Sequence, residues 1–593
     1  MAHGAGTPPP PGRERWLWMI STLAGVVSLV LSYRAFWTYL PSSVTGWRRI
    51  IEAVYSSAQL LLLHVSDADL VAMSAENSPL FQAARFLAVI FMGTTGAALV
   101  FKFFGNELRR DGVSRIGGHT VICGLTPFGQ QLAHEFSHLR DKLVVVADDS
   151  MDSAAVANAM ETGAGVLQGN AADARLLRKV YIHRAANVFV TSEDDGANIR
   201  VAKCAIEVVR ANSTRRSTGP HIHVHISDPE LRATLRLHRA FRADGIARVS
   251  MFNVFDNSAR LMLLDHPLDY TRITENDERV VQIVIIGFGL MGEAVLTRAA
   301  MLAHYANLKP LRALVIDHDA SRKERFFRSR YRHFSQVCDA TFIQADAEEP
   351  LTRGWIQDFC ADSQKTISTV VIALDNIARG LCIGLALADH LGPEIPIRVR
   401  SSDDSGLATS LRGAESDGSL PKQITEFGSM QEACARKNWL DDELDTMAKG
   451  LHKDYVRRRR DLHQQLVDDR SLRPWEQLDD DLIDSNRQLA DHVPVKLRAI
   501  GCYRVRCGSE DPGIPVKSFT PDQVMLLAKM EHQRWMAERF LAGWSPGPRD
   551  VDKRSSPYLV EWENIPPEIQ ENDRRVADIL PGVLASVGWE IRR

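Results

Sequence analysis

The strongest constraint on the fold of this chain is a series of apolar strands, glycine turns and aspartates that occurs twice. In the first copy, the apolar run Thr120–Cys123 precedes a turn with glycines at Gly124 and Gly129, and a helix is expected next. The following apolar run, Leu143–Ala147, ends at Asp148. This is near the spacing at which an acidic side chain reaches the ribose of a bound dinucleotide.

The second copy of the series is more complete. Val280–Ile286 is an apolar strand, the glycines Gly287, Gly289 and Gly292 form a full GxGxxG turn, and a later apolar run ends at Asp317. A lone GxGxxG turn is weak evidence for a nucleotide site. The whole series occurring twice predicts two Rossmann-like units, each an α/β fold on a parallel sheet.

Glycines in such turns let the backbone approach a pyrophosphate at the N-terminus of a helix. The first turn has a threonine at its middle position, so we expect the second unit to be the better nucleotide site. A carboxylate after the second strand would repel a 2′-phosphate, which favours a ligand with an unphosphorylated ribose. The residues predicted to bind it are Gly124, Thr126, Gly129 and Asp148 in the first unit and Gly287, Gly289, Gly292 and Asp317 in the second.

Two apolar runs precede the first unit. Trp16–Tyr33 is eighteen residues without a charge, and at about 1.5 Å per residue it can cross a bilayer core. Phe86–Phe101 is shorter, and a buried soluble helix is its alternative interpretation. Basic residues, including Arg13 and Arg15, flank the outer ends of the two runs. We therefore expect an inner (plasma) membrane protein with both termini and the bulk of the chain in the cytoplasm.

Between the apolar runs, Trp47–Val65 has the pattern of a re-entrant or interfacial amphipathic helix, and an acidic loop follows it. This is the plan of a two-span pore subunit, although the sequence lacks the TVGYG filter of potassium channels. A membrane anchor without a pore is the alternative. The residues predicted to line or hinge a pore are His64, Ser66, Asp67, Gly93 and Gly96.

Further short motifs accompany the glycine turns, and they point to one family. They are GNAAD at 169–173, SEDDGAN at 192–198, ADA at 345–347 and LDN at 374–376. With them, residues 118 to 425 resemble RCK (regulator of potassium conductance) or TrkA-N domains. The resemblance implies rings of Rossmann domains that bind NAD(H), ATP or ADP and pull on pore helices. It also implies four chains around one pore.

The C-terminal part contains an internal repeat. Residues 475–501 align with residues 562–588 at a displacement of 87, and 8 of 27 positions are identical. Upstream, His452 aligns with His532 at a displacement of 80. A tandem duplication explains both observations.

The second copy carries EHQRW at 531–535, GW at 543–544 and DR at 573–574. With these motifs it resembles the repeat of ryanodine receptors (the RyR domain), a small helical module without enzymatic activity. The resemblance implies a ligand- or partner-sensing role. The residues predicted to bind a ligand are His532, Arg534, Trp535 and Trp544. The alternative, which we prefer for the tryptophans, is that they form the core of a small domain.

Composition excludes several other classes of protein. The chain has 71 basic and 74 acidic side chains, so it has no basic excess for general nucleic-acid binding. Its eight cysteines contain no CxxC pair and follow the apolar runs, which excludes a disulfide-stapled secreted protein. His221, His223 and His225 share one face of a strand, but zinc would need a further ligand, so we predict no metal site.

The sequence therefore predicts a nucleotide-regulated membrane ion channel or ion-transport protein, passing a cation such as potassium. Its expected partners are membrane lipid, the nucleotide, the permeant cation and three further copies of itself. The alternative is a non-conducting, membrane-anchored sensor in stress or defence signalling. No catalytic residues are predicted, because nothing between the Rossmann-like units supplies a substrate domain. The expected parts are a tail (1–12), a membrane region (13–107), two Rossmann-like domains (118–270 and 278–425) and a mainly helical tandem repeat (440–593).

Overall fold

The computed structural model describes residues 13–62, 78–138, 143–147, 153–212, 219–241, 246–362, 364–401, 421–435, 445–461 and 470–593. The chain forms two compact units, Met1–Val113 and Ser114–Arg593.

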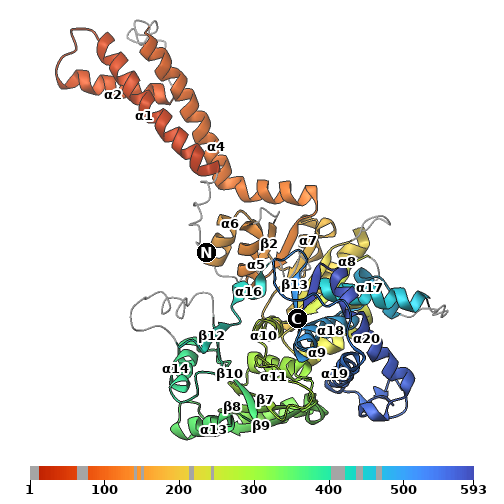
Figure 1. Ribbon diagram of the computed structural model, residues 1–593. Coiled ribbons are helices and arrows are strands. Elements are labelled where there is room, and N and C mark those ends of the chain that lie inside the picture. Colours follow the sequence, from red (N-terminus) through yellow and green to blue (C-terminus); the bar gives the residue numbers. More distant parts are fainter. Residues whose placement is uncertain are drawn as a thin grey trace. The chain divides into compact units, whose positions relative to one another are not determined.

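The N-terminal unit consists of helices α1 (Arg13–Tyr39), α2 (Trp47–Leu61) and most of α4 (Pro79–Ile116) (Figure 1). Two stretches are long and apolar enough to cross a membrane, Trp18–Tyr39 and Pro79–Ala97. Both predicted apolar runs are therefore helical. The first stretch begins and ends later than predicted, and the second begins and ends earlier.

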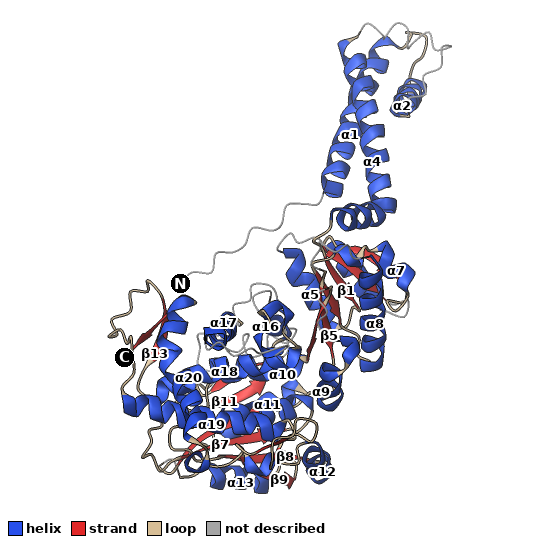
Figure 2. Cartoon of the chain, turned by 90° about the vertical axis from the view of Figure 1, so that its right-hand side faces the viewer, coloured by secondary structure: helices blue, strands red, loops and turns tan. Residues whose placement is uncertain are grey.

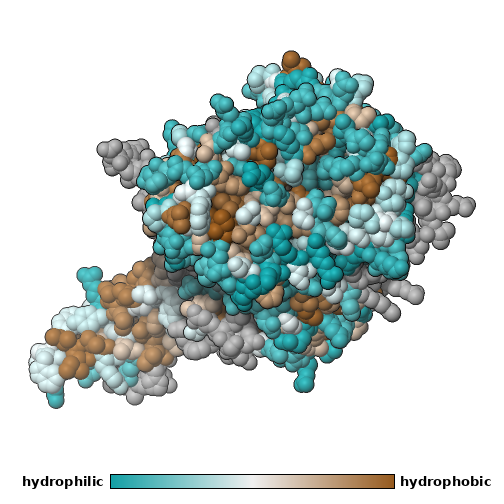
Figure 3. All heavy atoms as spheres, turned by 90° about the horizontal axis from the view of Figure 1, so that it is seen from below, coloured by the Kyte–Doolittle hydropathy of each residue, from teal (hydrophilic) through white to brown (hydrophobic). Residues whose placement is uncertain are grey.

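Small side chains bring α1 and α4 together. The Ser28 hydroxyl donates a hydrogen bond to the carbonyl of Ala84 (2.8 Å), and a Cβ added at Gly25 would lie 2.8 Å from the Phe91 ring. Small residues allow close helix approach where no hydrophobic effect drives packing. Large apolar side chains instead face outward, and these helices carry much of the apolar surface (brown, lower left) in Figure 3. Such a surface suits a lipid environment.

The second unit begins with a six-stranded parallel sheet in the order β3-β2-β1-β4-β5-β6. Figure 2 shows helices on both faces of its strands. This order is that of a doubly wound dinucleotide-binding fold. The strands are β1 (Thr120–Cys123), β2 (Leu143–Ala147), β3 (Gly165–Gln168), β4 (Asn187–Val190), β5 (His221–His225) and β6 (Arg248–Phe252). The helices are α5 (Pro127–His138), α6 (Ser153–Glu161), α7 (Ala174–Lys179), α8 (Asp195–Asn212), α9 (Pro229–Leu237) and α10 (Val254–Asp265).

A second parallel sheet has the same topology, with the order β12-β11-β10-β7-β8-β9. The prediction of two Rossmann-like units is thus confirmed. The strands are β7 (Val280–Ile286), β8 (Leu311–Asp317), β9 (Cys338–Gln344), β10 (Thr366–Ile372), β11 (Ile397–Arg400) and β12 (Ile424–Phe427). The helices are α11 (Leu290–Leu302), α12 (Ala320–Arg330), α13 (Pro350–Cys360) and α14 (Ile377–Ala388), and a short helix, α16 (Met430–Cys434), follows β12.

The C-terminal module has the same element order in each half. The first half contains α17 (Thr446–Asp461), η6 (Trp475–Gln477), α18 (Asp480–Ala499) and β13 (Tyr503–Arg506). The second contains α19 (Pro521–Leu541), η7 (Trp562–Asn564), α20 (Pro567–Ser586) and β16 (Trp589–Arg592). Strands β13 and β16 pair antiparallel and join the two halves. Helices α17 and α19 align at the displacement of 80, and η6 with η7 and α18 with α20 at the displacement of 87, as the sequence shows.

Candidate functional site

The second glycine turn uses each of its three glycines differently. Gly287 directly follows β7 and has a φ of +89°, a conformation that L side chains rarely adopt. A Cβ at Gly292 would lie 2.1 Å from the carbonyl oxygen of Gly287, so this glycine permits close packing of helix on strand. Gly289 precedes α11 with no side-chain cap, and a Cβ there would meet nothing within 4 Å. The N-terminus of α11 is therefore open to an anion.

Asp317 lies beside this turn, as its place in the sequence predicts. Its carboxylate accepts hydrogen bonds from the backbone N–H of Phe288 (2.7 Å) and of Asp319 (2.8 Å) and from the Lys323 ammonium (2.8 Å). Burial raises the pKa of Asp317, but the hydrogen bonds from Lys323 and the backbone outweigh burial and hold this pKa below its usual value. The carboxylate is thus ionised, and it is buried beside the turn with three hydrogen-bond donors.

The first glycine turn is arranged differently at its middle position. The Thr126 hydroxyl donates to the carbonyl of Thr191 (2.7 Å) and accepts from the backbone N–H of Gly129 (3.3 Å). Helix α5 starts at Pro127, which has no N–H. Thr126 therefore occupies the amide of Gly129, which a phosphate would otherwise bind. That the second turn is the better phosphate site stays a prediction. Asp148 lies outside the described residues.

The remaining membrane predictions are only partly covered. His64, Ser66 and Asp67 lie outside the described residues, so their role stays a prediction. Gly93 and Gly96 lie within α4, and a Cβ at either would meet nothing within 4 Å.

The four residues predicted as a ligand site in the C-terminal module all contact other residues of the same module. His532 is buried and hydrogen-bonds the carbonyl of Val560 (2.8 Å), and Arg534 is buried in ion pairs with Glu531 and Glu538. The rings of Trp535 and Trp544 pack against the hydrophobic core. This geometry favours the alternative interpretation, a structural role, over ligand binding at these residues.

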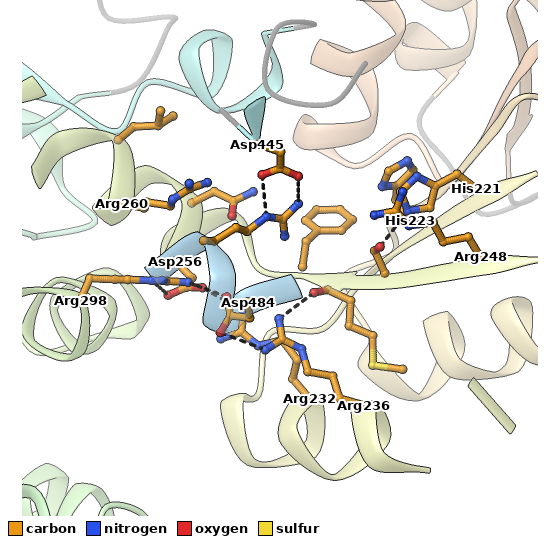
Figure 4. A pocket seen from close by; sticks show the side chains of 16 residues that line it. His221, His223, Arg232, Arg236, Arg248, Asp256, Arg260, Arg298, Asp445 and Asp484 are labelled. Carbon is orange, nitrogen blue, oxygen red and sulfur yellow. Dashed lines mark hydrogen bonds and ion pairs between the residues drawn. The ribbon is translucent and has the colours of Figure 1, made fainter. Parts of the chain in front are cut away.

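The structure also contains a charged cluster that the sequence analysis missed (Figure 4). Its residues come from β6, α9, α10, α11, α18 and the segment before α17, and they enclose a cavity of about 70 Å³. No local motif joins elements so distant in sequence. The charged residues of this arginine–aspartate cluster are Arg232, Arg236, Arg248, Arg260, Arg298, Arg487, Asp256, Asp445 and Asp484.

Ion pairs of the arginine–aspartate cluster tie the module to the Rossmann-like units. Arg260 on α10 holds Asp491 on α18 through two hydrogen bonds (2.6 and 2.7 Å), and Arg298 on α11 holds Asp256 on α10 (2.7 and 2.5 Å). Burial raises the pKa of Asp256, but Arg298 and Arg232 outweigh it and keep this pKa well below its usual range. The cluster is a buried electrostatic connection between the first sheet, α11 and α18.

The histidine strand forms part of the wall of this cavity. His221 hydrogen-bonds the Ser250 hydroxyl (2.7 Å), and the rings of His221 and His223 lie 3.8 Å apart. Among the described residues, no group of three or more His, Cys, Asp or Glu side chains could hold a metal ion.

Buried histidines are expected to make the compact unit Ser114–Arg593 less stable at acidic pH. Burial lowers the pKa of His223 and His304 to about 3 and that of His225 to about 4. Below about pH 6.5 these histidines bind protons in the unfolded chain but stay neutral in the folded protein. The free energy of unfolding is therefore unaffected by them above this pH and falls as the pH approaches their folded pKa values. Each of these histidines is expected to lower the free energy of unfolding by about 2 kcal/mol between about pH 6.5 and pH 5.

The measurement is the unfolding temperature of the purified protein at these two pH values, which should fall by several degrees. His223 stacks on Phe189 with ring centres 4.5 Å apart, so His223→Phe preserves the packing and should reduce the pH dependence. An unfolding temperature that does not change with pH would contradict neutral burial.

Comparisons with known proteins cover part of this architecture. A family model described as the TrkA-N domain matches residues 120–246, which contain strands β1 to β5. No curated protein matches the chain significantly.

Several solved structures are similar to the chain at low identity. GsuK bound to ADP is 18% identical, with 72% of this chain and 98% of that chain covered and a TM-score of 0.36. The GsuK channel is 17% identical, with 72% and 97% covered and a TM-score of 0.38. The GsuK channel bound to NAD is 15% identical, with 74% and 86% covered and a TM-score of 0.36. Similarity at this level does not by itself indicate a shared function.

Proposed function

We propose that this protein is a nucleotide-regulated membrane ion-transport protein, with a cation channel as its specific form and potassium as the first candidate ion. The observation that carries the proposal is the pair of Rossmann-ordered sheets, each with a glycine turn, in a chain that begins with two apolar helices. The TrkA-N match over residues 120–246 supports the same reading of the first sheet.

The regulatory ligand is an adenine nucleotide or NAD(H) bound at the second glycine turn. Gly289 leaves the N-terminus of α11 accessible, and the Asp317 carboxylate accepts hydrogen bonds from ribose hydroxyls. Asp317 is held by Lys323 on α12, so ligand binding competes with this contact. Regulation by this ligand then requires that it favour an arrangement of α12 in which Lys323 has left Asp317.

Four chains assemble around the pore, with the membrane-spanning helices in the inner membrane and both termini in the cytoplasm. The tandem module, with its resemblance to RyR domains, serves as a sensing part, and the protein performs no catalysis. The arginine–aspartate cluster supports coupling, because Arg260 joins α10 of the first unit to α18, and Arg298 joins α11 to Asp484 on α18.

Cation flux into liposomes that contain the purified protein tests this function, with NADH, NAD, ADP and ATP added in turn. Gly289→Asp places a carboxylate where a phosphate would bind and meets no neighbouring atom at Cβ. We expect nucleotide-dependent flux in the wild type and loss of this dependence in the variant. A nucleotide response that survives Gly289→Asp would place the regulatory site elsewhere.

A non-conducting, membrane-anchored nucleotide sensor is the second candidate, favoured by the missing TVGYG sequence. The same experiment separates the two. Nucleotide binding without flux under any condition would support the anchored sensor and contradict the channel.

A further inference from the structure

The two halves of the C-terminal module are related by a pseudo-twofold arrangement. Helix α17 corresponds to α19 at a displacement of 80, and α18 corresponds to α20 at a displacement of 87. The contact between α18 and α19 therefore has a counterpart between α20 and α17, and both pairs are in contact. Each pair forms one groove of the module, and the two grooves are equivalent by the internal repeat.

The groove between α18 and α19 is filled by the second Rossmann-like unit. Helix α11 contacts both α18 and α19, and His492 hydrogen-bonds the carbonyl of His304, just beyond α11 (2.9 Å). The residues that line this groove are accordingly buried. His492 is 0% exposed, Val495 7% and Phe540 7%.

The equivalent groove between α17 and α20 is open, with a volume of about 960 Å³. Its lining positions match the buried ones of the other half: Ile579 corresponds to His492, Gly582 to Val495 and Arg460 to Phe540. Gly582 and Arg460 are exposed, and Ile579 is half-buried. One groove thus holds a helix, and its counterpart has different side chains at the equivalent positions and holds no helix among the described residues.

The charges of the open groove select the kind of helix that fits. Four basic residues lie along one wall on α17, at Lys449, Lys453, Arg457 and Arg460. Arg457 pairs with Asp454 of the same helix (2.5 Å), and the carboxylates of Glu476 on η6 and Asp578 on α20 also line the groove. The floor is apolar, with Trp475, Ile579 and Val583 among its residues. A complementary helix has an apolar face for the floor and carboxylates along the edge that meets α17.

We propose that the groove between α17 and α20 is a docking site for an acidic amphipathic helix of a partner protein. The partner occupies the position that α11 occupies in the other half of the module. This inference goes beyond the proposed function and does not depend on it, because docking requires no ion conduction. The basic wall adds an electrostatic attraction that salt weakens.

A fluorescent synthetic helix tests the proposal with the full-length protein in detergent. The probe has leucines along one face and glutamates beside them, and a matched probe has lysines in place of the glutamates. We expect saturable, salt-sensitive binding of the glutamate probe, at least about tenfold tighter than that of the lysine probe. No saturable binding, or equal binding of both probes, would overturn the proposal.

Variants place the binding in the groove. Gly582→Trp fills the groove, and its Cβ meets no atom within 4 Å. Gly354→Trp on α13 is the matched control, because its Cβ also meets nothing. Arg457→Glu reverses a rim charge, with the exposed Arg325→Glu on α12 as its control.

We expect each groove variant to bind the glutamate probe at least about tenfold more weakly than the wild type, and each control variant to bind it with unchanged affinity. Binding that is unaffected by Gly582→Trp would overturn the proposal. The proposal would also be overturned if Gly582→Trp abolished the binding of a nucleotide but left the binding of the probe unchanged. The occupant of the groove would then be a small molecule.

Discussion

Glu531→Leu is expected to destabilise the C-terminal module by about 3 to 5 kcal/mol, the usual cost of breaking a buried ion pair. Glu531 binds the fully buried Lys496 ammonium (2.5 Å) and the Arg534 guanidinium (2.8 Å). Removing its carboxylate takes away the direct ion-pair partner of Lys496. Arg534 keeps its ion pair with Glu538 (2.9 Å), so the cost falls mainly on Lys496.

The chain itself contains the control for this prediction. The position equivalent to Lys496 is Val583 in the second half, and the position equivalent to Glu531 is Leu451 in the first half; both are buried. The double variant Lys496→Val with Glu531→Leu is therefore expected to recover most of the loss, since apolar pairs often replace buried ion pairs at little cost. Unfolding temperatures of the wild type, both single variants and the double variant complete the cycle. A loss below about 1 kcal/mol in Glu531→Leu would contradict the argument.

Gly292→Ala is expected to destabilise the second Rossmann-like unit by about 3 kcal/mol. Its Cβ would lie 2.1 Å from the carbonyl oxygen of Gly287, and this neighbour is backbone at the end of β7 rather than a flexible side chain. Relief of the overlap requires α11 to move away from the sheet. The unfolding temperature of the purified protein measures the effect.

Gly289→Ala is the matched control, because its Cβ meets nothing within 4 Å. We expect an unchanged unfolding temperature and a nucleotide affinity reduced by about tenfold, since the methyl group obstructs the approach of a phosphate to α11. A folded Gly289→Ala variant that binds nucleotide like the wild type would show that the second turn is not the binding site.

The sequence predicted those features that depend on local rules. Glycine at Gly287 and Gly292 reflects a positive φ and a close contact within one turn, and both are readable from the motif. Apolar runs of strand length predicted the parallel sheets, whose strands have four to seven residues. The displacement of 87 predicted the two halves of the module. The placement of Asp317 at the second turn followed from the same strand-and-turn rule.

The roles of several polar residues depended on hydrogen-bond and ion-pair partners from elsewhere in the fold, which the local sequence pattern does not reveal. His532 and Arg534 are polar residues beside tryptophans, a pattern typical of ligand sites, yet Val560, Glu531 and Glu538 satisfy them inside the module. Likewise, no pattern around Thr126 shows that its hydroxyl caps α5 while bonding the distant carbonyl of Thr191.

By itself, the sequence determined the two Rossmann-like units, their glycine turns, the apolar helices and the duplicated module. Strand length and backbone conformation depend on neighbouring residues, and a duplication is visible when the sequence is aligned with itself. Only the tertiary structure decided which charges are buried together and which of two equivalent grooves is filled. Arg260 and Asp491 are 231 positions apart, and their pairing exists only where α10 and α18 pack. Long-range packing sets the dielectric environment and the partner of each charge, and these determine whether a polar residue stabilises the fold or remains available to bind.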